Sequence, residues 1–386
     1  MRRRVLPVLS VLIGLAAVVA TQQLPPGQLR PRPGQGRAPE FPAPTITDYK
    51  PRSTLVVPEH KVPRAKFPVI DIHFHPPGQL ASPDVMNRIA EAITPLNLRL
   101  MISASGASGD RLQQTVAAIA ASPHKDRFVT FTNVNWGNVA AGGAQQAVAQ
   151  LEADVKAGAR GVGEVGKGLG MSTRKPDGSR LKLDDPVLDP IWEACARLKI
   201  PVLIHTGDPS EFFQPLDFNN ERWLEMALFA NRRFFDRARY PAFDDLMAER
   251  DRMLMKHPKT TFVLAHLGWH ANDLARLGRL MDKLPNLHGE VGAILYDLGR
   301  QPRFAHDFFA KYQDRILFGK DSFQPDEYPY YWRVFETSDE YFDYYRDYHA
   351  FWKLYGMNLP DAVLKKLYYQ NALRIVPGLP KGAFPK

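Results

Sequence analysis

The sequence predicts a (β/α)8 barrel, the TIM-barrel class of α/β fold, over residues 67–386. Short runs rich in β-branched and aliphatic residues alternate there with longer amphipathic segments. Eight such runs, each followed by a helical segment, form the repeat of that barrel. The expected strands span residues 68–73, 98–103, 127–134, 159–164, 200–206, 260–266, 287–293 and 315–321. A doubly wound open sheet is the alternative, but no glycine fingerprint follows the first run.

Amphipathic helices are expected between these strands, because apolar residues recur there at helical spacing. The clearest segments are SPDVMNRIAEAI (82–93), AQQAVAQLEADVKAG (144–158), DPIWEACARLK (189–199), FDDLMAERDRMLMKH (243–257), NDLARLGRLMDKL (272–284) and RFAHDFFAKY (303–312). The third contains Cys195, the only cysteine, so the chain has no intrachain disulfide. We expect a buried structural thiol at that position.

Two connections, residues 207–242 and 322–359, are too long to be plain turns. Long connections in compact domains are usually functional when they are ordered, and the second is dense in aromatic residues. Both leave the carboxyl ends of expected strands, the face on which barrel enzymes keep their chemistry. We therefore expect them to cover the site and to contact the substrate. A homodimer interface made of the same aromatics is the alternative.

The first 66 residues are set apart from the barrel by their composition. Arg2–Arg4 precede an apolar run (residues 5–20) that ends in small residues before Thr21, the pattern of a secretory signal peptide over residues 1–20. The run is short for a membrane span, and an uncleaved anchor is the alternative. Residues 21–66, rich in proline and glycine, are expected to form a linker and an N-terminal arm. We expect a periplasmic or secreted protein without stable membrane insertion once the signal is removed.

The charge of the chain indicates no nucleic-acid or membrane-surface partner. The formal net charge of +9 falls to +6 when residues 1–20, with three arginines and no acid, are removed. The remaining basic residues are scattered through the sequence and form no stripe.

Residues able to bind a metal stand at the ends of several expected strands. They are His73 and His75 in the first, Glu164 in the fourth, His205 in the fifth, His266 in the sixth and Asp321 in the eighth. The ends of parallel barrel strands share one rim, so these side chains should converge. Imidazole nitrogens and carboxylate oxygens are the donors that zinc and related divalent ions prefer. Each residue alone could be an ordinary strand or loop residue, but their common position predicts a divalent-metal centre.

The motifs that carry these residues resemble those of a known superfamily. DIHFHP, GVGEVG, VLIHTGDP, FVLAHLG and ILFGKDS, in this order, look like the strand-end motifs of the amidohydrolase superfamily. They are most similar to the branch that contains aminocarboxymuconate-semialdehyde decarboxylase, and LYYQNALRI resembles that branch's closing helix. The resemblance covers roughly residues 66–377. It implies a distorted barrel of the metal-dependent hydrolase type that holds one or two divalent ions. Zinc is the first candidate for the metal.

The resemblance also implies roles for individual residues. His73, His75, His205 and Asp321 would take metal-ligand positions. His266 would bind a second ion or act on the substrate carbonyl. Glu164 stands where some relatives carry a carbamylated lysine and others no ligand, so its role as a ligand stays open.

Three further residues lie near these motifs. Lys167 is a candidate for binding a substrate carboxylate, with a solvated loop lysine as the alternative, and Trp269 is expected to contact the substrate. Lys320 replaces the small residue usual before the aspartate. By strand alternation its side chain should point away from the barrel axis and serve the structure.

The leading functional hypothesis is hydrolysis of a small-molecule ester, lactone or amide by a metal-activated water. Asp321 would move the proton of that water, and His266 would polarise the carbonyl. The alternative is metal-dependent, non-oxidative decarboxylation of an aromatic or unsaturated carboxylic acid, since the same motifs serve both reactions. A secreted binding protein with a vestigial site is disfavoured because all six groups are present. A nuclease is disfavoured because there is no concentrated basic groove.

Overall fold

Parallel strands form the centre of the fold in the computed structural model, which describes residues 41–385. The strands are β1 (Val69–His75), β2 (Leu98–Ser103), β3 (Phe128–Thr130), β4 (Val162–Val165), β5 (Val202–Ile204), β6 (Phe262–Leu264), β7 (Leu287–Glu290), β8 (Ile316–Leu317) and β9 (Asp321–Ser322). Each of the eight expected strands is present, although most are shorter than expected. The central positions of β5 and β6 are apolar and buried throughout, as strands covered on both faces require.

The strands follow one another around a barrel. Its eighth strand is split into β8 and β9. One sheet has the order β3-β2-β1-β9 and the other β4-β5-β6-β7-β8. The eighth strand joins them because β8 pairs with β7, and β9, separated from β8 by three residues, pairs with β1. On the other side, Thr132 and Val162 form a parallel bridge between the segments of β3 and β4. These contacts confirm the predicted (β/α)8 fold, with irregular pairing where the two sheets meet.

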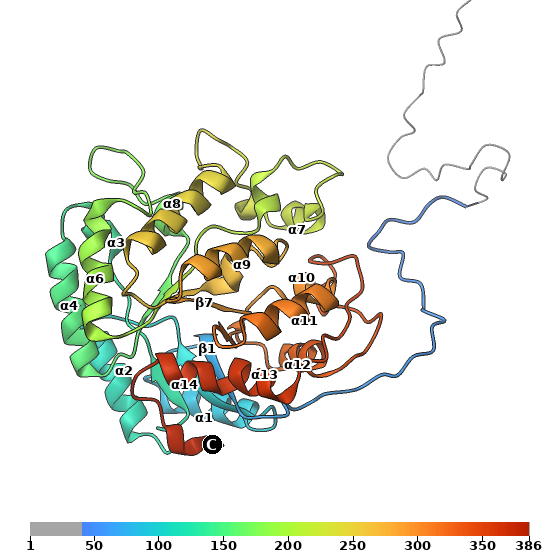
Figure 1. Cartoon of the computed structure of the whole chain (residues 1–386), viewed down its shortest axis with the longest axis horizontal. Coiled ribbons are helices and arrows are strands. Elements are labelled where there is room, and N and C mark those ends of the chain that lie inside the picture. Colours follow the sequence, from blue (N-terminus) through green and yellow to red (C-terminus); the bar gives the residue numbers. More distant parts are fainter. Residues whose placement is uncertain (1–40, 386) are drawn as a thin grey trace, which may run out of the picture. The chain divides into compact units, whose positions relative to one another are not determined.

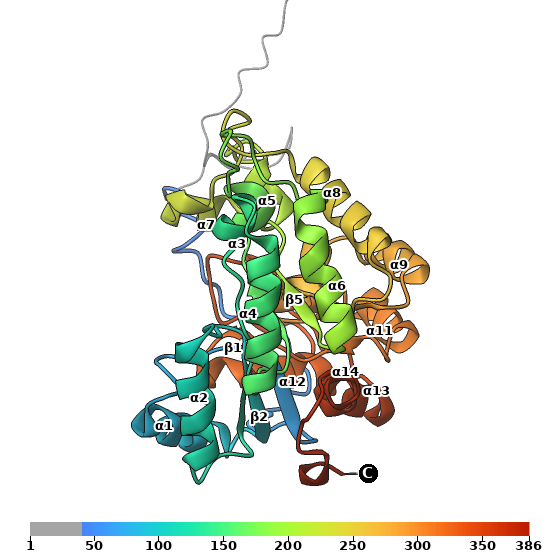
Figure 2. The ribbon, with the colours of Figure 1, turned by 90° about the vertical axis from the view of Figure 1, so that its left-hand side faces the viewer.

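Helices surround the strands (Figures 1 and 2). They are α1 (Pro83–Ile93), α2 (Asp110–Ala121), α3 (Trp136–Ala140), α4 (Ala144–Ala157), α5 (Gly168–Met171), α6 (Asp189–Leu198), α7 (Trp223–Leu228), α8 (Phe243–Lys256), α9 (Leu274–Lys283), α10 (Leu295–Gly299), α11 (Pro302–Lys311), α12 (Tyr328–Glu336), α13 (Asp361–Lys365) and α14 (Asn371–Ile375). All six helical segments singled out in the sequence are helices. Cys195 on α6 is buried and unpaired, and burial raises the pKa of its thiol to about 12.

The aromatic-rich connection 322–359 belongs largely to the core. Tyr328, Tyr331 and Trp332 of α12 are completely buried, and their rings contact the ring of Phe318, which follows β8. The sequence pattern predicted substrate contact or a dimer interface for these aromatic residues. In α12 they serve mainly to pack the core. The exposed large apolar residues of this connection are Tyr341 and Phe351.

The chain divides into two units, Met1–Val56 and Val57–Lys386. Residues 57–66 of the expected arm belong to the second unit, where the His60 backbone N–H donates to Asp339 Oδ2 at 2.8 Å. Residues 41–56 of the first unit are exposed and contain neither helix nor strand. The predicted signal peptide (residues 1–20) and residues 21–40 of the linker lie outside the described residues.

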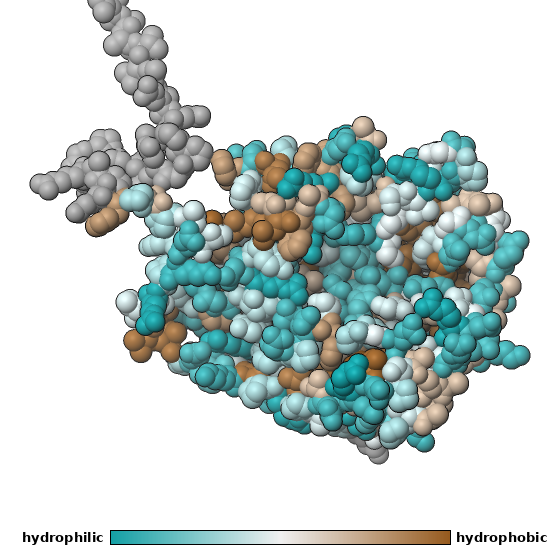
Figure 3. All heavy atoms as spheres, turned by 180° about the vertical axis from the view of Figure 1, so that it is seen from behind, coloured by the Kyte–Doolittle hydropathy of each residue, from teal (hydrophilic) through white to brown (hydrophobic). Residues whose placement is uncertain are grey.

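Exposed hydrophobic residues occur in separate groups on the surface (Figure 3). In residues 57–385, most of the large ones lie on the two long connections, as with Phe218, Leu228, Phe235, Tyr341 and Phe351. None of the helices within residues 41–385 has the length and apolar content that a membrane span needs.

Candidate metal centre

The six residues predicted at the strand ends lie together, and Glu290 joins them. Their donor atoms form three overlapping groups, in each of which all the atoms lie within 4.8 Å of one another. The groups are His73–His75–Asp321, Glu164–His205–His266 and His73–His266–Glu290. The side chains that the sequence places at strand ends therefore do lie close together in the structure.

The two histidines of β1 point to the same place, because alternate residues of a strand share a face. Their Nε2 atoms are 3.1 Å apart. The Glu164 carboxylate faces both of them, with Oε1 3.3 Å from His73 Nε2 and Oε2 3.5 Å from His75 Nε2. Asp321 Oδ1 lies 3.5 Å from His75 Nε2 and 3.9 Å from His73 Nε2. One spot thus receives two imidazole nitrogens and two carboxylates.

His205, directly after β5, completes this set. Its Nδ1 lies 2.5 Å from Glu164 Oε1. Its Nε2 is buried and has no hydrogen-bond partner within the described part of the chain, and it is 3.8 Å from Asp208 Oδ1. Burial lowers the pKa of His205, but the Glu164 and Asp208 carboxylates together outweigh this effect, so the pKa rises to about 9. Burial also raises the pKa of Glu164, but His73 and His205 outweigh it and hold that pKa far below its usual range.

His266 is oriented by two hydrogen bonds, one from its backbone and one from its ring. Its backbone N–H donates to Glu290 Oε1 at 2.6 Å, and its Nδ1 donates to the Gly292 carbonyl at 2.8 Å. A carbonyl only accepts, so the proton of a neutral ring is on Nδ1 and Nε2 carries a lone pair. Burial, and then the nearby His205, lower the pKa of His266, which favours that neutral form.

Glu290, in β7, was not predicted as a site residue. It is completely buried, and its carboxylate accepts from His73 Nδ1 at 3.0 Å and from the Gly292 N–H at 2.6 Å. By accepting from Nδ1 it leaves His73 Nε2 directed at the centre, the role that carboxylates play behind metal-binding histidines. An acid inside the apolar run LHGEVGA was the available signal.

Asp71, two residues before His73, is a second buried acid that sequence reasoning missed. Its Oδ1 accepts from the backbone N–H groups of His73 (3.0 Å) and Lys320 (3.2 Å), and its Oδ2 accepts from Tyr328 Oη (2.8 Å). Burial raises the pKa of this carboxyl to about 6. Asp71 thereby joins β1 to the chain just before Asp321 and fixes their relative positions.

Lys167 and Trp269, predicted to contact substrate, both border the centre. Lys167 Nζ is paired with Asp208 Oδ2 at 2.6 Å and lies 5.5 Å from the Phe234 ring. The Trp269 indole stacks on the His266 ring, with 4.4 Å between centroids, and donates to the Gly207 carbonyl at 3.1 Å. Lys320 has the structural contacts that strand alternation predicted, because its Nζ is buried and pairs with Glu327 Oε2 at 2.5 Å.

A pocket of about 250 Å³ lies beside His75. Ser105, which lines it, hydrogen-bonds His75 Nδ1. Arg111 is the charged residue of its lining, and its guanidinium has no ion pair or hydrogen bond to any of residues 41–385. The pocket therefore offers one unmatched positive charge next to the cluster of donors.

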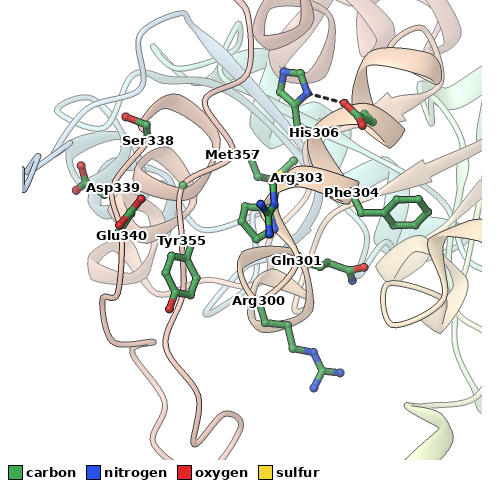
Figure 4. A pocket seen from close by; sticks show the side chains of 13 residues that line it. Arg300, Gln301, Arg303, Phe304, His306, Ser338, Asp339, Glu340, Tyr355 and Met357 are labelled. Carbon is green, nitrogen blue, oxygen red and sulfur yellow. Dashed lines mark hydrogen bonds and ion pairs between the residues drawn. The ribbon is translucent and has the colours of Figure 1, made fainter. Parts of the chain in front are cut away.

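A larger hollow, about 940 Å³, lies elsewhere. It is formed by residues 300–307 around the start of α11 and by the segments 338–340 and 355–357 (Figure 4). None of the converging donors lines it, and His306, within it, is paired with the neighbouring Asp307 at 3.1 Å. Size alone does not identify the functional site here.

The donor set fits a divalent cation. Imidazole and carboxylate groups supply lone pairs, and no lysine or arginine of residues 41–385 pairs with Glu164, Asp321 or Glu290. The buried, unpartnered Nε2 of His205 is a vacant donor of the kind that a metal would engage. The barrel fold and this set of metal-binding side chains together place the protein in the class of metal-dependent barrel enzymes.

A family model described as Amidohydrolase matches residues 70–378, so the chain belongs to the amidohydrolase family and is an enzyme of that family. No curated protein matches the chain.

Solved structures with a TM-score of 0.50 show the same fold at low sequence identity. An uncharacterised TIM-barrel protein, Bb4693 from Bordetella bronchiseptica, is 17% identical with a TM-score of 0.50, over 80% of this chain and 97% of that one. A dihydroxybenzoic acid decarboxylase from Polaromonas sp. JS666, with bound manganese and the inhibitor 2-nitroresorcinol, is 15% identical with a TM-score of 0.50, over 80% and 96%. A 2,6-dihydroxybenzoate decarboxylase from Rhizobium is 15% identical with a TM-score of 0.49, over 80% and 98%.

Proposed function

We propose that this enzyme is a metal-dependent hydrolase of a small-molecule ester, lactone or amide. The observation that carries the proposal is the convergence of imidazole nitrogens and carboxylates from β1, β4, β9 and the ends of β5 and β6 on one spot. His73, His75, His205 and Asp321 would hold the ion, with Glu164 as a further ligand. Zinc suits this donor set, and manganese is the alternative because a structural neighbour contains it.

A divalent ion in this position polarises a carbonyl and lowers the pKa of water. Asp321 is suited to move the proton, because its carboxylate borders the two β1 histidines and its side chain is 35% exposed. It would accept the proton of the attacking water and pass it to the leaving group.

Of the two roles expected of His266, this proposal keeps the binding of a second ion and drops the polarisation of the carbonyl. A neutral ring with its proton on Nδ1, bound to the Gly292 carbonyl, has only a lone pair on Nε2. Such a nitrogen cannot donate to a substrate carbonyl. Its roles are to bind a second ion, with Glu164 and His205 as its neighbours, or to accept a proton.

Substrate contacts come from groups around the centre. We propose that Arg111 binds an anionic group of the substrate in the pocket beside His75, since its charge has no partner among the described residues. Lys167 is already paired with Asp208 and would first have to leave it. Trp269, stacked on His266, would form an apolar wall.

Non-oxidative decarboxylation of an aromatic or unsaturated acid is the second candidate. The unpaired guanidinium of Arg111 favours it, because an acid substrate needs a cationic partner. The structural neighbour from Polaromonas, whose name states a decarboxylase, also favours it.

The proposal is tested by measuring metal content and by assaying the metal-loaded enzyme against esters, lactones, amides and aromatic acids. Cleavage of an ester, lactone or amide, lost on chelation and restored by added zinc or manganese, supports hydrolysis. Release of carbon dioxide from an aromatic acid without any hydrolysis would replace it by the second candidate.

Location and assembly stay proposals as well. The predicted signal in residues 1–20 carries the expectation of a periplasmic or secreted enzyme. Exposed Phe218, Leu228 and Phe351 on the long connections are where a homodimer contact would form.

A further inference from the structure

A second charged pocket, of about 460 Å³, lies apart from the metal centre. Its walls are the segment 174–182, which folds back through an antiparallel bridge between Arg174 and Arg180, the segment 237–241, and one face of α8. The basic residues of its lining are Arg174, Arg180, Lys182, Arg237, Arg239 and Arg252, and the acidic ones are Asp245 and Glu249. Residues that are scattered in the sequence are thus gathered by the fold.

The floor of this pocket is held rigidly. Arg180 binds both oxygens of the buried Glu249, at 2.5 and 2.8 Å, and donates to the Gly170 carbonyl at 2.5 Å. The guanidinium of Arg237 donates to the carbonyls of Phe213 (2.6 Å) and Phe234 (2.9 Å), which fix its position, and no carboxylate of residues 41–385 pairs with it.

The rim carries more unmatched positive charge. Arg174, Lys182 and Arg239 are exposed, and no carboxylate in the described part of the chain pairs with them. Arg252 is matched by Asp184 at 2.7 Å, and Asp245 is the one acid of the lining without a cation. Like charges held in one concave site repel one another, and an anion placed among them would relieve that repulsion.

We propose that this pocket binds a compact polyanion carrying two phosphate or sulfonate groups. Guanidinium groups bind such oxyanions with paired hydrogen bonds. A ligand with two charged groups matches unmatched cations that come from different walls, and the volume is of the size that small ligands occupy. The concave shape favours a small anion over a membrane, which needs a flat basic surface.

The consequence of binding would be local order. The segment 174–182 belongs to the connection between β4 and α6, and 237–241 belongs to the connection between β5 and α8. An anion shared by the two would join the connections that follow Glu164 and His205, without touching either residue. Binding should therefore raise the melting temperature.

The test is calorimetric titration of the metal-loaded enzyme with pyrophosphate and with ethane-1,2-disulfonate, a poor metal ligand, at fixed ionic strength. Phosphatidylserine vesicles are titrated separately. We expect saturable binding of both, and weakening by about tenfold or more in the double variant R174Q/K182Q. The matched control R279Q/K259Q removes one arginine and one lysine that are exposed and unpaired within residues 41–385, but lie outside the pocket.

Four outcomes would overturn the proposal. They are no saturable binding of either anion, equal weakening in the two double variants, binding of pyrophosphate that disappears with the metal while the disulfonate does not bind, and binding only to phosphatidylserine vesicles. The side chains of Arg174 and Lys182 have no ion pair or hydrogen bond to another described residue that the substitutions would remove, so an unchanged melting temperature without anion shows that R174Q/K182Q is folded.

Discussion

The metal centre and the network around Arg222 both bury charged groups, but they balance them differently. At the centre, Glu164, Asp321 and Glu290 meet imidazoles and no lysine or arginine among residues 41–385. In the network, Arg222 Nε donates to Glu225 Oε2 at 2.9 Å, and Arg232 pairs with the other oxygen.

The network also joins the two long connections to the barrel. Arg222 and Glu225 belong to the connection after β5, and His349 of the connection after β8 lies 3.2 Å from Glu225 Oε1. The Arg222 guanidinium is 4.2 Å from the centre of the Tyr296 ring on α10. Burial of charge alone therefore does not identify a site. A set of carboxylates and imidazoles with no lysine or arginine partner among residues 41–385 does.

The largest effect is expected from Asp321→Asn at the centre. The variant should keep much of its metal, because the three histidines and Glu164 remain, but should lose turnover by roughly three orders of magnitude, since an amide cannot accept the proton. Turnover and metal content are measured on the same preparation. Asp326→Asn, the same change at an exposed residue, is the control. Full activity in Asp321→Asn would rule out the proposed role.

Glu225→Gln tests the network. It leaves the buried Arg222 without its carboxylate, so we expect the free energy of unfolding to fall by about 3 kcal/mol. Denaturant unfolding measures the change. Glu221→Gln, which breaks a more exposed pair with Arg300, should cost less than about 1 kcal/mol. Equal losses in the two variants would show that the network is no more than a surface contact.

The same network predicts a dependence of stability on pH. Burial lowers the pKa of His349 to about 4, below its ordinary value in the unfolded chain. The folded state therefore binds fewer protons than the unfolded state as the pH falls from about 6.5 to about 4, and the contribution of His349, up to about 3 kcal/mol, is lost over that window. His349→Gln should flatten the curve of stability against pH there. The half-buried His306 offers the control His306→Gln, and identical slopes in all three proteins would contradict the assignment.

The sequence predicted those residues of the centre whose side-chain direction is fixed by strand geometry. His73 and His75 share a face because of the two-residue period, and the other ligand candidates stand where parallel strands end. Glu290 was missed because it acts from behind His73, on the side of Nδ1, and contacts of that kind leave no spacing signal. The pair of Arg222 and Glu225 lies in a long connection without periodicity, so nothing in the sequence indicated their burial.

Glu290→Gln tests whether a buried carboxylate at the metal centre serves metal binding. Its carboxylate accepts from His73 Nδ1 and from two backbone N–H groups, so the amide should leave the fold intact but hold His73 less firmly and make it less basic. We expect metal affinity, measured by competition with a chelator, to fall by about 10- to 100-fold. Glu249→Gln also alters a buried carboxylate, paired with Arg180 away from the donors, and should reduce stability without changing metal affinity. If both variants lost metal equally, the effect would follow from stability, and Glu290 would be no more than another buried acid.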